Sequence, residues 1–216
     1  MELLKGKKYE GIDLLLETAG GVTDATEKIC SLLRQMAPDL RVIVPRKAKS
    51  NGTVIALTGK SVLMAPSSEL GPIDPSVFGV PAEYIMKDPQ AYTPSVFRVA
   101  ESASQQTKKL AKYLLSTGML EGKTPQELEA VVQKLASRDC YASHGSVIDI
   151  REATELGLTV EAFAPDDELW GQLWLLRTMC AYDCPRSGYA KLFESATIST
   201  AVVVKPPAPQ PNPPAP

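Results

Sequence analysis

A serine at position 50 stands between a strand-like stretch and a helix-like stretch, and this junction constrains the fold more than any other feature of the chain. Residues 42–44 (VIV) form a short apolar run typical of a buried strand, and residues 54–57 (VIAL) predict an apolar helix that reaches about Leu57. Pro45 and the residues after it provide the exit from the strand. A serine at such a turn lies near a helix N-terminus, where free N–H groups favour developing negative charge. We therefore expect Ser50 to act as a nucleophile in acyl transfer, with simple helix capping as the alternative.

A double glycine forms a second turn of the same kind. An apolar stretch beginning at Ile12 runs into Gly20 and Gly21, and a helix is expected to follow. Two glycines allow a sharp turn and bring bare N–H groups close to a ligand, as an oxyanion hole requires. The alternative is an ordinary glycine-rich turn. Together with Ser50, the pattern predicts that the amides of Gly21 and Asn51, helped by Gly20, receive an oxyanion.

Strands and helices are expected to alternate through the first third of the chain. Helical spacing predicts a helix over residues 23–36, capped by Thr23 or Asp24. Further strands are expected at residues 41–44 and 61–65, on either side of the Ser50 turn and its helix. This alternation is typical of an α/β protein with a largely parallel sheet.

The central third is predicted to be mainly helical. Residues 77–94 contain three prolines and predict an irregular excursion or lid, followed by a long helix over residues 95–116. Thr124 and Glu127 form a capping box around a proline, which predicts a helix to about residue 137. Asp149 and Glu152 repeat the pattern and predict a short helix that stops at Gly157.

The C-terminal part is expected to differ from what precedes it. Acidic residues 166–168 predict the start of another helix, on which Trp170 and Trp174 are interpreted as core or subunit packing, with a ligand stack as the alternative. Residues 199–204 predict a strand, and the proline-dominated residues 206–216 predict an extended, disordered tail. We divide the chain into a main domain over residues 1–160, a helical extension over 161–204 and a disordered tail over 205–216.

Composition excludes several functions. A net charge of −2 and a pI near 5.6 do not favour nucleic-acid binding, which needs a basic face. No apolar run approaches the roughly 20 residues of a membrane span, so we expect a cytoplasmic protein that meets a membrane only through a missing anchor or a partner. Four cysteines and one histidine do not predict a metal site, and we expect free thiols, with a redox pair of Cys180 and Cys184 as the alternative.

Four segments together resemble the serine dehydrogenase proteinase family. They are residues 15–21 (LLETAGG), 44–57 (VPRKAKSNGTVIAL), 64–75 (with MAP and LGPIDP) and 144–149 (HGSVID). That family is grouped with signal peptide peptidase A and the Clp protease, and its fold is shared with the crotonases. The resemblance covers roughly residues 9–160. Related domains carry another strand and helix before the first glycine turn, so we interpret the chain as an alternative start, a fragment or a divergent short form.

The resemblance implies both a fold and a mode of action. It implies a Clp/crotonase-like α/β fold, with a parallel sheet built from repeated β-β-α and β-α units and a C-terminal helical extension. It also implies homo-oligomers that act on proteins or peptides and need neither metal nor cofactor. The chain has no G-x-G-x-x-G turn, so we do not carry over the dehydrogenase activity in the family name.

The general base is the least constrained residue of this site. The signal peptide peptidase branch uses a lysine on the long helix, which implies Lys108, Lys109 or Lys112. If the apolar side chains of that helix face the core, Lys108 lies nearest their edge and is favoured, with Lys109 second and a solvated basic face as the alternative. The Clp branch places a histidine in the segment that corresponds to residues 70–75, where this chain has none. His144, the only histidine, is expected to be structural or close to the substrate, and a direct catalytic part is the alternative.

We therefore predict a serine peptidase that hydrolyses peptide bonds through an acyl-enzyme, with a serine–lysine dyad and a Gly-Gly oxyanion hole. Two alternatives from other classes remain open. One is an inactive scaffold or partner-binding homologue, and the other is a crotonase-like acyl-CoA enzyme, in which Ser50 has no special task and a carboxylate matters instead.

Overall fold

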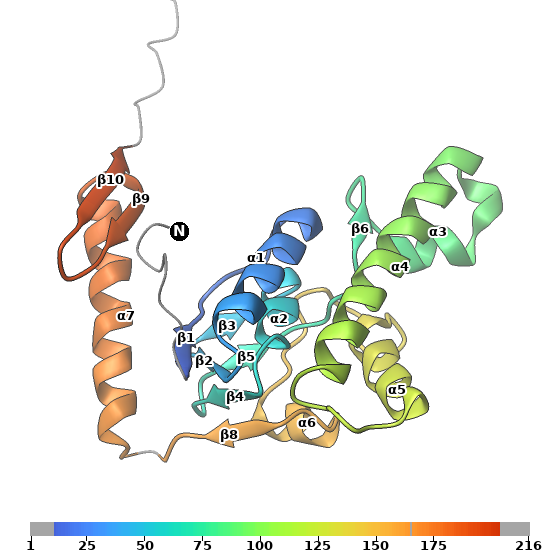
Figure 1. Cartoon of the computed structure of the whole chain (residues 1–216). Coiled ribbons are helices and arrows are strands. Elements are labelled where there is room, and N and C mark those ends of the chain that lie inside the picture. Colours follow the sequence, from blue (N-terminus) through green and yellow to red (C-terminus); the bar gives the residue numbers. More distant parts are fainter. Residues whose placement is uncertain (1–10, 165, 204–216) are drawn as a thin grey trace, which may run out of the picture. The chain divides into compact units, whose positions relative to one another are not determined.

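The computed structural model describes residues 11–164 and 166–203 (Figure 1). The contacts of the chain divide these residues into two units, one that ends at Trp170 and one that begins at Gly171. Each unit is described separately.

A four-stranded parallel sheet forms the centre of the first unit. Its strands are β1 (Ile12–Leu15), β2 (Leu40–Val44), β4 (Ser61–Met64) and β8 (Val160–Ala162), and they are arranged in the order β1-β2-β4-β8. All four residues of β4 and four of the five in β2 are buried, because helices cover both faces of a parallel sheet. The predicted α/β class with a largely parallel sheet is confirmed.

Five helices supply most of the remaining core of this unit. They are α1 (Thr23–Met36), α2 (Asn51–Ala56), α4 (Pro94–Ser116), α5 (Pro125–Ala136) and α6 (Ile150–Glu155). Helix α1 packs against α2, and α4 packs against α5. Every residue of α2 is buried, which agrees with the apolar helix predicted after Ser50.

Local capping chemistry sets where several of these helices begin. Helix α5 has the predicted capping box, in which the hydroxyl of Thr124 accepts from the N–H of Glu127 while Glu127 accepts from the N–H of Thr124. These hydrogen bonds from Thr124 hold the pKa of Glu127 at about 2. Asp149 caps α6 as predicted. The predicted cap of α1 is wrong, because Val22 occupies the N-cap position and no side chain makes the capping hydrogen bond.

The segment predicted to be irregular is instead folded onto α4. Two strands of two residues each, β6 (Ser76–Val77) and β7 (Val80–Pro81), pair as an antiparallel hairpin. They are followed by helix α3 (Ala82–Lys87) and the 3₁₀ turn η2 (Pro89–Ala91). Helix α3 packs against α4, as Figure 1 shows, and Ile85 is buried there with Ala100. Pro81 ends β7, whereas Pro89 and Pro94 begin η2 and α4, and apolar side chains between these prolines bury against the long helix.

The second unit begins within α7 (Glu168–Arg186) and ends with an antiparallel hairpin. The hairpin strands are β9 (Tyr189–Glu194), which was not predicted, and β10 (Ser199–Val203), which agrees with the strand expected at residues 199–204 as far as it is described. None of the described residues of α7 is buried. The predicted disordered tail lies outside the described residues, and the division at residue 160 stays a prediction.

We predict that core truncation on α4 destabilises the first unit strongly. Leu114 is 1% exposed, so Leu114→Ala should lower the free energy of unfolding by about 2–5 kcal/mol. Val99 lies on the same helix and is 49% exposed, so Val99→Ala should change it by no more than about 0.5 kcal/mol. Urea unfolding followed by circular dichroism measures both values. Equal effects of the two variants would show that α4 does not pack as described.

Candidate functional site

Ser50 has a backbone conformation that few residues other than glycine adopt. Its φ is 54° and its ψ is −124°, at the turn between β3 (Lys47–Ala48) and α2. Such a conformation costs about 1–3 kcal/mol and persists only where the surroundings impose it. Ser50 occupies the N-cap position of α2, yet its side chain makes no capping hydrogen bond. The structure therefore does not support the alternative that Ser50 serves as a helix cap.

The turn is imposed by the segment that follows β1. The N–H of Lys49 donates to the carbonyl of Thr18 over 3.1 Å, and the N–H of Thr18 donates to the carbonyl of Lys47 over 3.0 Å. Gly20 has a φ of 107°, and a Cβ at this position would lie only 2.8 Å from the Cβ of Ser50. A Cβ at Gly52 would overlap the side chain of Thr18. Glycine is thus required where the two backbones meet.

The three residues predicted to form an oxyanion hole differ in whether their backbone N–H groups are free to bind an oxyanion. The N–H of Gly20 donates to the hydroxyl of Thr18 over 3.0 Å, so Gly20 supplies space and not a free donor. Within the described residues, the N–H groups of Gly21 and Asn51 make no hydrogen bond. The side-chain amide of Asn51 donates to the carbonyl of Gly21 over 2.6 Å. This contact joins Gly21 to Asn51, and both residues line the same pocket.

That pocket has a volume of about 130 Å³ and brings together chain segments far apart in sequence. Its lining residues are Gly21, Thr23, Ser50, Asn51, Ile73, Asp74, Pro75, Ser76, Thr107 and His144. Residues with hydroxyl, amide, carboxylate and imidazole groups line it, so the pocket is mainly polar.

A buried carboxylate lies behind the histidine. Oδ1 of Asp74 lies 2.9 Å from Nδ1 of His144, and Oδ2 lies 2.7 Å from Nε of Arg138. The side chains of Asp74 and Arg138 are only 3% and 7% exposed, whereas that of His144 is 41% exposed. The ion pair of Asp74 with Arg138 offsets part of the cost of burying both charges. His144 is therefore held at one ring nitrogen and is open to solvent elsewhere.

The sequence did not predict that Asp74 and Arg138 belong to the site. Asp74 belongs to the LGPIDP segment, and an acidic residue between two prolines in an apolar stretch was the available signal. Arg138 follows α5 and carries no motif. Only the fold brings it to the carboxylate.

The candidate lysines lie on α4 but not on the lining of the pocket. Nζ of Lys108 donates to Gln133 of α5 over 3.0 Å, and Nζ of Lys112 donates to Glu129 over 2.7 Å. Lys109 is exposed. The residue of α4 that reaches the pocket is Thr107. The lysine base stays a prediction.

Lys49, next to Ser50, is a buried lysine that the sequence analysis did not single out. Its Nζ donates to the carbonyls of Leu70 and Ser146 over 3.0 and 2.9 Å, and lies 3.2 Å from a carboxylate oxygen of Glu69. These three acceptors hold the ammonium group in place. Lys49 therefore ties the segment that carries His144 to the strand before Asp74.

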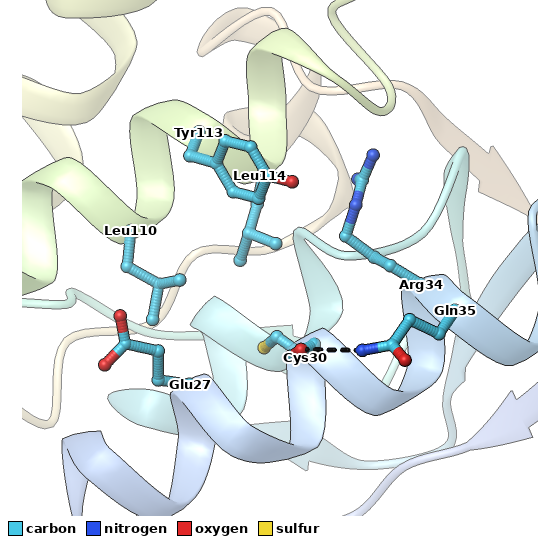
Figure 2. A pocket seen from close by; sticks show the side chains of 8 residues that line it. Glu27, Cys30, Arg34, Gln35, Leu110, Tyr113 and Leu114 are labelled. Carbon is cyan, nitrogen blue, oxygen red and sulfur yellow. Dashed lines mark hydrogen bonds between the residues drawn. The ribbon is translucent and has the colours of Figure 1, made fainter.

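A larger hollow lies between α1 and α4, with a volume of about 510 Å³ (Figure 2). Figure 2 shows Cys30 and Arg34 of α1 facing Leu110 and Tyr113 of α4. Cys30 is the cysteine on the lining of this hollow, and burial raises the pKa of its thiol. A thiol with a raised pKa is a poor nucleophile at neutral pH. The smaller pocket at Ser50 is therefore the better candidate for a reaction site.

No three His, Cys, Asp or Glu side chains converge on a metal-sized space within residues 11–164 and 166–203. In the same residues, no helix has both the length and the apolar character needed to cross a membrane.

The strain at Ser50 makes a stability prediction that needs no substrate. Ser50→Gly should be more stable than Ser50→Ala by about 1 kcal/mol, because glycine adopts the positive φ without strain and this gain exceeds its extra unfolded-state entropy. Ser31, in the middle of α1, should show the opposite order, with Ser31→Gly less stable than Ser31→Ala by about 0.5–1 kcal/mol. Urea unfolding of the four variants measures both differences. The same order at both positions would contradict a strained Ser50.

Two uncharacterized proteins of one organism are similar to this chain in sequence. The protein is 31% identical to the uncharacterized protein MJ0137 of Methanocaldococcus jannaschii over 169 residues, which cover 74% of this chain and 57% of that protein. It is 28% identical to the uncharacterized protein MJ1495 of the same organism over 163 residues, which cover 71% of this chain and 53% of that protein. The chain thus spans little more than half the length of these relatives.

A solved structure and a family match complete the comparison. The structure of the 1510-N membrane-bound stomatin-specific protease superposes with a TM-score of 0.50 at 20% identity, covering 76% of this chain and 69% of that one, which shows a shared fold. Residues 4–179 match the family described as ClpP-like SDH-type serine proteinases. The chain therefore belongs to the ClpP-like SDH-type serine proteinase family.

Proposed function

We propose that this protein is a serine peptidase in which Ser50 attacks the carbonyl carbon of a peptide bond. The strained, uncapped turn at Ser50 is the observation that carries this proposal, because strain of this kind gathers at reactive residues. The N–H groups of Gly21 and Asn51 receive the oxyanion as the Oγ–C bond forms. Gly20 allows the close approach that this arrangement needs.

A protein or peptide substrate is the matching proposal. Family membership supports it, and the structural relative with a TM-score of 0.50 is itself named a protease. The polar pocket of about 130 Å³ is too small for a whole substrate and suits a single reacting group. The rest of a peptide therefore lies outside this pocket.

An acyl-CoA reaction of the crotonase type fits the pocket less well. Such a reaction uses a carboxylate as a base, and Asp74 is the carboxylate on the lining. Both of its oxygens are already engaged, one by His144 and one by Arg138. That reaction also gives Ser50 no role, so it leaves the strained backbone of this residue unexplained.

Labelling with a fluorophosphonate tests the nucleophile. We expect the wild-type protein to gain the mass of one phosphonyl group and to cleave casein, and Ser50→Ala to lose both properties while its circular dichroism spectrum is unchanged. Ser102→Ala changes an exposed serine of α4 and should behave as wild type. A folded wild-type protein that neither labels nor cleaves would favour the inactive scaffold. Cleavage that survives Ser50→Ala would place the nucleophile elsewhere.

We also propose that the protein is a cytoplasmic homo-oligomer. The second unit supports the oligomer, because its large apolar side chains are exposed and exposed apolar patches mark interaction surfaces. They include Leu175, Leu176 and Met179 on α7 and Phe193 on β9.

Light scattering after size exclusion tests the oligomer. We expect the wild-type protein to have a mass that is a multiple of 23.3 kDa. The double variant Leu176→Glu with Met179→Glu should have a smaller mass, because charge in an apolar interface is costly. Thr178→Glu adds a charge to the same helix at a polar position and should keep the wild-type mass. A wild-type mass of one chain would refute the oligomer.

A further inference from the structure

We propose that Phe78, at the tip of the β6–β7 hairpin, contacts an apolar side chain of the peptide that Ser50 cleaves. This inference rests on the proposed peptidase function and concerns the part of the substrate that lies outside the small pocket. It begins from the backbone. Within residues 11–164 and 166–203, Ser50 and Phe78 are the two residues other than glycine that have a positive φ. Ser50 lines the pocket, and Phe78 closely follows the stretch over residues 73–76 that lines it too.

The turn of the hairpin contains a residue that its conformation does not favour. Val77 pairs with Val80. The loop between them consists of Phe78 and Gly79, whose φ values are 52° and 80°. Two-residue turns of this kind favour asparagine followed by glycine, because both positions need a positive φ. Gly79 suits its place, whereas a bulky side chain at the position of Phe78 is strained.

The ring of Phe78 gains no burial in return for this strain. The residue is 85% exposed, the highest value among the exposed large apolar residues in the described part of the chain. Exposure of an apolar residue is common and carries little information by itself. Strained backbone conformations, in contrast, gather at active sites and ligand contacts. The combination therefore indicates that the ring contacts a ligand.

The base of the hairpin is held in place by the core. Val77 is 7% exposed and belongs to a buried apolar cluster with Ala82, Ile85 and Ala100. The N–H of Ala82 donates to the carbonyl of Pro75 over 2.9 Å, which closes the chain below the two strands. Figure 1 shows the hairpin standing out beside α4. The exposed ring is thus presented from a fixed base.

The place of the hairpin favours the substrate as its partner. Ser76 is the first residue of β6 and lines the pocket. Phe78 follows two residues later, and two residues of chain span at most about 7 Å. The pocket of about 130 Å³ holds only the reacting group, so the peptide continues over its rim. An extended peptide held at Ser50 can therefore reach the ring with a residue a few positions from the scissile bond. An apolar side chain there removes two apolar surfaces from water.

Casein cleavage tests this contact. Phe78→Ala should lower kcat/KM for casein about tenfold, mainly through a higher KM, because burial of a phenylalanine side chain contributes on that order. The loss toward casein should greatly exceed the loss in the rate of fluorophosphonate labelling, since that small probe does not extend to the hairpin tip. Phe78→Trp keeps an aromatic ring and should recover most of the casein activity. Ile29→Ala removes an exposed apolar side chain of α1 and should cleave casein as wild type does.

Mass spectrometry of the casein fragments shows which substrate residue is involved. The wild-type protein should prefer an apolar residue at one position near the scissile bond, and Phe78→Ala should lose that preference. The same preference in both proteins would overturn the inference. A smaller mass of Phe78→Ala in light scattering, with an unchanged KM for casein, would also overturn it and assign the ring to a contact with a second copy of the chain.

Urea unfolding separates a binding role from a structural one. Phe78→Asn should unfold at a higher urea concentration than wild type, because asparagine suits the positive φ, and should still have a raised KM for casein. A purely structural residue would not gain stability while it loses substrate affinity. A lower urea midpoint, or KM values equal to wild type in Phe78→Asn and Phe78→Ala, would overturn the inference alone. A wild-type protein that neither labels nor cleaves would overturn the peptidase function and this inference with it.

Discussion

Backbone hydrogen bonds between Thr18 and the residues before Ser50 hold the candidate site together. They join the end of β1 to the turn after β3, and they force two glycines to lie where any side chain would collide. The unusual φ of Ser50 follows from this, because backbone hydrogen bonds fix the chain on both sides of the serine, at Lys49 and at Gly52. The parallel sheet supports this arrangement, since β1 and β2 are neighbours in it.

The part of the site that contains Asp74 and His144 is held to the Ser50 turn by a second set of contacts. The pairing of Leu70 with Ile148 and the ammonium group of Lys49 bring a late loop against the early turn. The loop carries His144, and the chain near Leu70 leads to Asp74. A single buried lysine therefore connects the nucleophile to the groups that face it. The side chain of Lys49 can be buried because its ammonium group lies within reach of two backbone carbonyls and the carboxylate of Glu69.

Local chemistry made much of the fold predictable. The capping box of α5 and the cap of α6 are set by residues three apart, so the sequence was enough to place those helices. The segment over residues 77–94 was predicted wrongly, because its structure depends on apolar contacts with α4 and not on its own prolines. The start of α1 was also wrong in detail, since Val22 and not Thr23 or Asp24 takes the N-cap position.

The sequence by itself determined the α/β class, the family and the candidate serine. These depend on apolar runs, glycine pairs and short ordered motifs, which are properties of neighbouring residues. Only the tertiary structure decided which residues line the pocket together with Ser50. Helical spacing could rank Lys108 at the edge of α4, but the rotation and packing of that helix bring Thr107 to the pocket. Asp74, Arg138 and His144 come together because distant segments pack against each other, and no local pattern encodes that contact.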